Sequence, residues 1–228
     1  MASTLVILIS AQYSDPVTPT RQYYRPLIGG IQIETPYGFC TLGYTARDSR
    51  GRVGVITAGH CVGYSYSADV YQPNTGSASY YIRRPDIISM FADAAFIPFS
   101  NSAPYVLDIN EFYGTYYASK WNVYDYVPYD DACTYFKNVP VFKTGRTTGT
   151  TKGSIYGCYD YIHPVGYVLI VTMYAAPGDS GAPVYTISPH GDGALLFGHL
   201  KGYTSYGLSA ISVTAVINGM GVIPVTYP

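Results

Sequence analysis

The sequence predicts an all-β protein, and three observations favour that class. The 228 residues include 24 glycines, 16 prolines and 27 tyrosines, which supply turn formers and β-favouring aromatic side chains. Charged residues make up only 12% of the chain and hydrophobic residues 48%, so most of it can be buried. The apolar runs are short and are separated by polar turns, as expected for strands.

Composition also excludes several classes of protein. The formal net charge of −1 gives no electrostatic reason to expect nucleic acid or an anionic membrane surface as a partner. No apolar run approaches the roughly 20 residues of a membrane span. The four cysteines contain no C-x-x-C pair, which argues against a zinc site.

The first 26 residues are predicted to be an N-terminal extension. Residues 4–10 are apolar, but the run is short and no lysine or arginine precedes it, so it is a poor signal peptide. Residues 15–20 contain two prolines and are typical of an extended linker.

Strands are then expected in pairs. Residues 41–46 and 53–57 are apolar and β-rich, and the polar turn 47–51 between them predicts a hairpin. Residues 70–82 indicate further strands around the turn 73–76.

The second half begins after a segment without clear periodicity. Residues 101–132 are rich in tyrosine and aspartate and are interpreted as a crossover. Near the end, residues 212–219 open on a serine and close on a glycine, which predicts one short helix. Between the crossover and this helix, short apolar runs predict strands at 139–143, 167–174 and 194–200.

The strongest chemical motif is the stretch 178–183, where Ser180 lies between glycines and follows an acid. A serine that attacks a substrate needs a nearby base and backbone N–H groups directed at the developing oxyanion. His60 is a candidate base, and Asp93 is a candidate acid to orient it, with Asp86 as a rival. The order His60, Asp93, Ser180 is one of the known chain orders of a Ser-His-Asp triad.

These three segments resemble the chymotrypsin-like serine proteases, most closely the α-lytic protease and streptogrisin group. The resemblance covers roughly residues 27 to 225, and the segment 144–149 also matches that group. It implies two packed six-stranded antiparallel β-barrels with a short C-terminal helix and the active site between the barrels. The expected divisions are an extension at 1–26, a first barrel at 27–112, a crossover at 113–132 and a second barrel at 133–228.

The resemblance assigns roles to individual residues. Ser180 would be the nucleophile, His60 the general base and Asp93 the group that holds the imidazole. The backbone N–H groups of Gly178 and Ser180 would form the oxyanion hole. The implied disulfides are Cys40–Cys61 and Cys133–Cys158.

Asp179 is expected to be buried behind the serine loop, where an unpaired charge is costly. In the group resembled, a basic side chain from the second barrel pairs with this acid, so activity would not require a free amine at Ile28 or Ile31. Lys143 is the best match for that base, and Arg146 is the alternative.

The substrate pocket is implied at two places. One is Tyr174, and the other is the segment that contains Lys201, Gly202 and Tyr203. Because Tyr174 is not acidic, a preference for lysine or arginine is disfavoured, and a large neutral or aromatic side chain is expected. Two alternatives stay open: Lys201 and His199 could favour an acidic side chain unless they point away, and Tyr203 could narrow the pocket. The hydroxyl that often supports the triad acid in this family is missing near residues 200–201.

The predicted protein is a secreted, monomeric serine endopeptidase that acts on polypeptides through an acyl-enzyme. No cofactor, metal, nucleic acid or membrane span is expected. Two alternatives remain, a catalytically silent homologue that binds peptides and a serine esterase. Metal ligation is a weaker alternative, because no known ligand spacing fits the histidines at 60, 163, 190 and 199.

Overall fold

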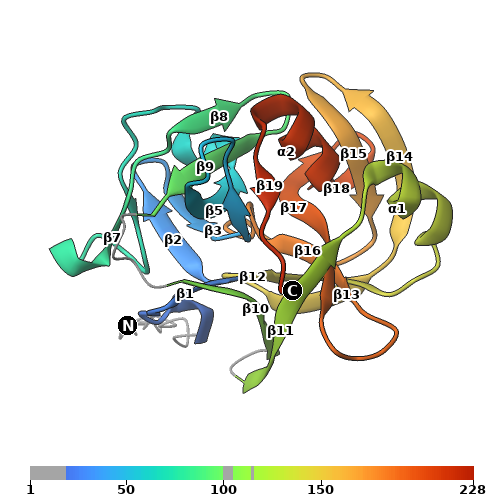
Figure 1. Ribbon diagram of the computed structural model, residues 1–228, viewed down its shortest axis with the longest axis horizontal. Helices are drawn as coiled ribbons and strands as arrows, with labels where there is room; N and C mark the ends of the chain where they lie inside the picture. The colour runs from blue at the N-terminus through green and yellow to red at the C-terminus, as the bar shows by residue number, and fades with distance from the viewer. Residues whose placement is uncertain (1–18, 100–104, 114–115) are drawn as a thin grey trace, which may run out of the picture.

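The computed structural model describes residues 19–99, 105–113 and 116–228. Most of the predicted extension, residues 1–18, therefore lies outside the described residues. Figure 1 shows two halves side by side, the first coloured blue to green and the second yellow to red. The fold is mostly β, as predicted, and its strands form sheets of ten, five and four strands.

The first half contains the two smaller sheets. The five-stranded sheet has the order β19-β4-β5-β9-β8, and the four-stranded sheet has the order β3-β2-β6-β7. Two 3₁₀ helices, η2 (Gly59–Val62) and η3 (Ala78–Tyr80), connect these strands, and η1 (Pro19–Arg21) precedes them. The strands are β2 (Gln32–Thr35), β3 (Gly38–Thr41), β4 (Thr45–Arg47), β5 (Val53–Ala58), β6 (Val70–Tyr71), β7 (Tyr81–Arg83), β8 (Ile87–Ser89), β9 (Ala94–Pro98) and β19 (Ile223–Pro224).

The ten-stranded sheet forms the second half and extends beneath the first. Its main path is β1-β10-β11-β17-β16-β12-β13, and β14, β15 and β18 continue it through β17. The strands are β1 (Leu27–Gly29), β10 (Tyr105–Tyr113), β11 (Tyr116–Tyr126), β12 (Val141–Gly145), β13 (Gly149–Gly153), β14 (Ile155–Ile162), β15 (Val165–Val171), β16 (Pro183–Ile187), β17 (Ala194–Thr204) and β18 (Gly207–Ser212).

The strands agree with the predicted fold class, although the sheets do not close into two six-stranded antiparallel barrels. The strands form three open sheets, and β1–β10 and β11–β17 are parallel pairs. The chain leaves one sheet for another between β3 and β4, where isolated bonds such as Gly43 N–H to the Ile56 carbonyl replace a continuous ladder. The short C-terminal helix and the all-β class are confirmed.

The segment from 105 to 135 is more regular than its sequence indicates. Strands β10 and β11 form a long antiparallel hairpin, and the helix α1 (Tyr129–Tyr135) follows. Figure 1 shows β11 running from the lower edge of the molecule up toward α1, beside the C-terminus. The predicted crossover at 113–132 thus contains a full strand and the start of a helix.

The C-terminal helix α2 (Val213–Met220) begins where the sequence predicts and ends later. The Ser212 hydroxyl accepts a hydrogen bond from Thr214 N–H, as an N-cap does. Gly219 lies inside the helix, and the left-handed cap is Gly221 at φ 63°. The helix packs on strands of both halves, including β8 and β18.

Three apolar clusters form the interior of the described structure. One fills the first half around Ile31, and another fills the second half around Phe197. The third is shared, because Tyr44 and Phe96 of the first half join Leu196 and Val213 of the second. Burial of each such large side chain contributes about 1.5–3 kcal/mol, so this shared cluster fixes one half against the other.

Candidate active site

His60 and Asp93 are brought together by strand register. Strands β5 and β9 pair antiparallel, with Ala58 opposite Ala94. His60 follows β5 by two residues, and Asp93 immediately precedes β9, so both lie at the same end of the pair. The Asp93 carbonyl accepts from Gly59 N–H at 2.7 Å. A β-carbon at Gly59 would lie only 3.0 Å from Ala94 N, which explains the glycine there.

The Asp93 carboxylate is fully buried and accepts several hydrogen bonds. Its Oδ2 lies 2.9 Å from His60 Nδ1 and 3.1 Å from Lys201 Nζ. Its Oδ1 accepts from His60 backbone N–H at 3.0 Å and from the Tyr64 hydroxyl at 2.8 Å. The Asp93 φ of 38° lies in the left-handed region, which aspartate tolerates better than most residues.

This environment holds the Asp93 side chain ionised. Burial by itself raises the pKa of Asp93, but the His60 bond and charge, the Lys201 charge and the Tyr64 bond outweigh it. The pKa of Asp93 is therefore well below its usual range. A carboxylate in this state holds one imidazole tautomer, with the proton on Nδ1 and a lone pair on Nε2.

Ser180 lies in the loop between β15 and β16, pressed against the first half. Its carbonyl accepts from Thr41 N–H at 2.9 Å and lies 3.7 Å from the sulfur of Cys61, the residue after His60. Its hydroxyl donates to the Lys201 carbonyl at 3.2 Å. In the described structure, this hydroxyl forms no hydrogen bond with the His60 ring.

The glycines beside Ser180 permit this close approach. Gly181 has φ 86°, and a β-carbon there would lie 2.3 Å from the Thr41 carbonyl. Gly178 has φ 97°. Within the described part of the chain, the N–H groups of Gly178 and Ser180 have no hydrogen-bond acceptor, whereas those of Asp179, Gly181 and Ala182 do.

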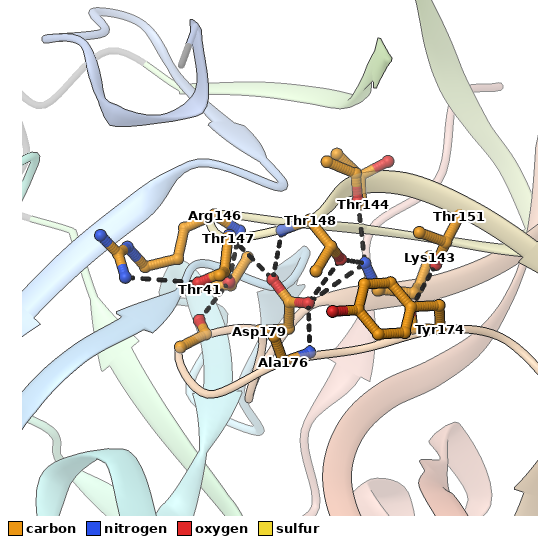
Figure 2. Close-up of polar contacts among 12 residues, drawn as sticks. Thr41, Lys143, Thr144, Arg146, Thr147, Thr148, Thr151, Tyr174, Ala176 and Asp179 are labelled. Carbon is orange, nitrogen blue, oxygen red and sulfur yellow. Dashed lines mark hydrogen bonds and ion pairs between the residues drawn. The ribbon is translucent and has the colours of Figure 1, made fainter. Parts of the chain in front are cut away.

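Asp179 is buried behind the serine loop and pairs with Lys143. Figure 2 shows its carboxylate surrounded by donors, with Lys143 Nζ at 3.3 Å from Oδ2. Thr147 N–H and Thr148 N–H donate to Oδ1, and the Thr148 hydroxyl donates to Oδ2 at 2.6 Å. Ala176 N–H completes the set at 3.1 Å. Both charged side chains are fully buried.

The structure distinguishes the two candidate bases for Asp179. Lys143 also donates to the Gly149 carbonyl at 2.9 Å and to the Thr148 hydroxyl. Burial lowers the pKa of Lys143, and the facing carboxylate opposes that change. Arg146 instead donates from Nε to the Gln32 side chain at 2.7 Å, and its guanidinium lies 4.9 Å from the Phe39 ring centre.

Both implied disulfides are present. Cys40–Cys61 links β3 to η2, the short helix that carries His60. Cys133–Cys158 links α1 to β14 at the far side of the second half.

A cavity of about 180 Å³ opens beside Ser180. Gly202 and Tyr203, both predicted to bind substrate, line it. Tyr174 is 67% exposed and lies outside the lining. The complete lining is Ala175, Ala176, Pro177, Ser180, Leu200, Gly202, Tyr203 and Leu208.

The Lys201 ammonium binds Asp93, and the residue is not among those that line the cavity. Its predicted role in substrate binding stays a prediction. Lys201 and Tyr64 both donate to the Asp93 carboxylate. No local motif indicates Lys201 in this role, whereas Tyr64 follows His60 by four residues, within one short turn.

The remaining candidates lie elsewhere. Asp86, the rival acid, forms an ion pair with Arg52 at the surface. His199 is fully buried and its Nε2 lies 3.0 Å from the Asp93 carbonyl oxygen. Among the described residues, no group of three or more His, Cys, Asp or Glu side chains is arranged to hold a metal ion. The described helices include none that is long and apolar enough to cross a bilayer.

The fold is that of the chymotrypsin-like serine proteases. No protein-family profile matches the sequence, and no curated protein matches it. Solved structures do match. One is a glutamic acid-specific serine protease that uses a histidine triad in substrate binding, with a TM-score of 0.65 at 19% identity. The match covers 87% of this chain and 100% of that one.

Two further structures illustrate the likeness. The Cellulomonas bogoriensis chymotrypsin has a TM-score of 0.60 at 21% identity, covering 88% of this chain and 98% of that one. The α-lytic protease homologue N4 has a TM-score of 0.59 at 20% identity, covering 86% and 98%. At these identities the likeness establishes the fold, and the chemistry must be argued from the site itself.

Proposed function

We propose that this protein is a serine endopeptidase that cleaves peptide bonds through an acyl-enzyme. The observation that carries the proposal is the buried Asp93 carboxylate on His60 Nδ1, joined through Lys201 to Ser180, which lines a cavity. The order of these residues and the chymotrypsin-like fold support it. The proposal assigns nucleophile, base and orienting acid to Ser180, His60 and Asp93.

In the proposed reaction, the Ser180 hydroxyl leaves the Lys201 carbonyl, rotates to His60 Nε2 and gives up its proton as its oxygen attacks the scissile carbonyl. Such bonds are often long or misdirected before substrate binds. The N–H groups of Gly178 and Ser180, which lack acceptors in the described structure, would bind the oxyanion. His60 then protonates the leaving amine, and water releases the acyl group by the reverse sequence.

The lining of the cavity supports a large apolar or aromatic side chain before the cleaved bond. Its walls include Ala175, Ala176, Leu200 and Leu208, with the Tyr203 ring at the rim, and no lining side chain is charged. The neighbour specific for glutamic acid uses histidines in substrate binding. Here His199 is buried against the Asp93 carbonyl, and Lys201 is paired with Asp93, so neither serves an acidic substrate group.

The proposed setting is an oxidising compartment outside the cytoplasm. Two disulfides in a chain with no free cysteine among the described residues support secretion. Polypeptides are the proposed substrates, and a monomer is the proposed working unit.

The test is covalent labelling with a fluorophosphonate, followed by mapping of peptide products from a library. We expect label on the peptide that contains Ser180, loss of label in Ser180→Ala, and retention in Ser67→Ala, a matched change at an exposed serine. Products should end in large apolar or aromatic residues.

Other outcomes select the alternatives. Labelling with cleavage of esters but no peptides would favour the esterase. Peptide binding without labelling would favour the silent homologue. Label that persists in Ser180→Ala would refute the assignment of the nucleophile.

A further inference from the structure

We propose that Lys201 is a positioning residue that adjusts the proton affinity of His60 through Asp93 and so extends activity toward acidic pH. The inference rests on the proposed function for its effect on activity. The feature behind it is one carboxylate oxygen, Asp93 Oδ2, that binds both the His60 ring and the Lys201 ammonium.

The geometry places the Lys201 ammonium beside the imidazole, where both bind the same carboxylate oxygen. His60 Nδ1 lies 2.9 Å from Oδ2 and Lys201 Nζ lies 3.1 Å from the same atom. The two nitrogens are therefore within about 6 Å of each other, the range in which a like charge disfavours protonation. The carboxylate that would stabilise an imidazolium is already partly neutralised by the ammonium.

The charged and titratable groups around His60 in the described structure are Asp93, Tyr64, Lys201 and His199. Asp93 comes from the turn before β9, and Tyr64 comes from the segment after η2 and donates to Asp93 Oδ1. From β17 come Lys201 and His199. Burial lowers the pKa of His199, which stays neutral and donates through Nε2 to the Asp93 carbonyl. Among these groups of the described structure, Lys201 carries the positive charge.

The backbone and the side chain of Lys201 make separate contacts with the candidate site. Its backbone carbonyl accepts from the Ser180 hydroxyl, while its side chain reaches Asp93. Lys201 lies at a bulge of β17, but its neighbours Leu200 and Gly202 both pair with β18, so we expect a substitution that shortens or neutralises the side chain to keep the carbonyl in place. The charge can therefore be removed without removing the backbone contact to the serine.

Asp93 is not left without donors when the ammonium is removed. His60 and Tyr64 still donate to it, through the ring, the backbone N–H and the hydroxyl. The Lys201 side chain is 24% exposed, and methionine has a similar length, so we expect it to be accommodated there. We therefore expect Lys201→Met to fold.

The first experiment measures the rate of fluorophosphonate labelling from pH 4 to pH 9. In Lys201→Met the midpoint of the acid limb should rise by about one pH unit relative to the natural chain. Lys201→Arg, which keeps the charge, should retain a midpoint near the original. Lys152→Met, the same change at an exposed lysine, is the control. A lower rate at every pH with an unmoved midpoint would show a merely structural role and overturn the proposal.

The second experiment does not depend on activity. In the Ser180→Ala background, NMR of ¹³C-labelled histidine follows the four imidazoles, and the His60 signal is identified by its loss in His60→Gln. Lys201→Met should raise the His60 midpoint by a similar amount. An unmoved midpoint would refute the proposal. Failure of the natural chain to label would refute the proposed function alone, since this titration still decides the role of Lys201.

Discussion

Two aspartates, Asp93 and Asp179, are both fully buried and both bind the ammonium of a lysine, yet their surroundings differ. Asp179 is enclosed by backbone N–H groups, the Thr148 hydroxyl and the buried Lys143. Asp93 instead binds a titratable imidazole that is 36% exposed and a lysine that is 24% exposed.

The difference separates a fixed charge from an adjustable one. Apart from the fully buried Lys143, the partners of Asp179 are backbone N–H groups and a threonine hydroxyl, which do not titrate near neutral pH, so we expect its pair to hold the serine segment in place. The titratable partners of Asp93 are partly exposed to solvent, so the charge around it can be redistributed as a proton moves. Substitutions and pH changes that disrupt the surroundings of one aspartate or the other test this difference.

The largest expected effect is on stability, from Lys143→Met. Loss of the ammonium leaves the Asp179 carboxylate buried without its cation, which should cost about 3–5 kcal/mol of unfolding free energy. Urea denaturation measures it. Lys137→Met, the same change at an exposed lysine, should have little effect.

A double variant tests the reason for that loss. Lys143→Met with Asp179→Asn removes both charges and should be less destabilised than Lys143→Met alone. If the double variant loses as much as the sum of its two single variants, the ion pair is not the source of the effect.

The next effect comes from a matched pair of hydroxyl deletions. Tyr64→Phe removes a donor to Asp93, and Thr148→Val removes a donor to Asp179. Each should cost about 1.5–3 kcal/mol in urea denaturation, the range for hydrogen bonds to charged groups. Only Tyr64→Phe should also move the acid limb of fluorophosphonate labelling, because Asp93 alone contacts the imidazole. An equal movement in Thr148→Val would erase the proposed distinction.

The smallest effect is the acid dependence of stability. Because the folded pKa of Asp93 is depressed, the unfolded chain binds its proton first as pH falls. The stability that this group contributes is present above about pH 4, the unfolded value, and is lost as pH falls through the folded pKa. The natural chain should lose up to about 1.4 kcal/mol per pH unit more than Asp93→Asn below pH 4. Parallel curves for the two chains would contradict the depressed pKa.

Sequence reasoning predicted the parts of the site that local motifs encode. The segments around His60, Asp93 and Ser180 each carry glycines or strand boundaries that fix their conformation, and Cys61 and Lys143 follow from family positions. The sequence also indicates the start of α2 through Ser212, which lies beside the residues that it caps.

The parts it missed depend on distant contacts. The approach of Lys201 to Asp93 joins residues 108 positions apart, and no motif encodes it. The sequence of the β10–β11 hairpin has no clear alternation, and its pairing with β1 and β17 at its two sides is a distant contact that no local pattern encodes. The sheets are likewise open where the chain passes from one sheet to another, as it does between β3 and β4.

The apolar cluster shared by the two halves has a consequence for the design of chimeric proteins. Tyr44 and Phe96 on one side and Tyr185 and Leu196 on the other interdigitate in a common interior. A chimera that takes its amino-terminal lobe from one parent and its carboxy-terminal lobe from another would join two surfaces shaped for different partners. Crossovers placed within a lobe, away from that seam, would preserve the fit.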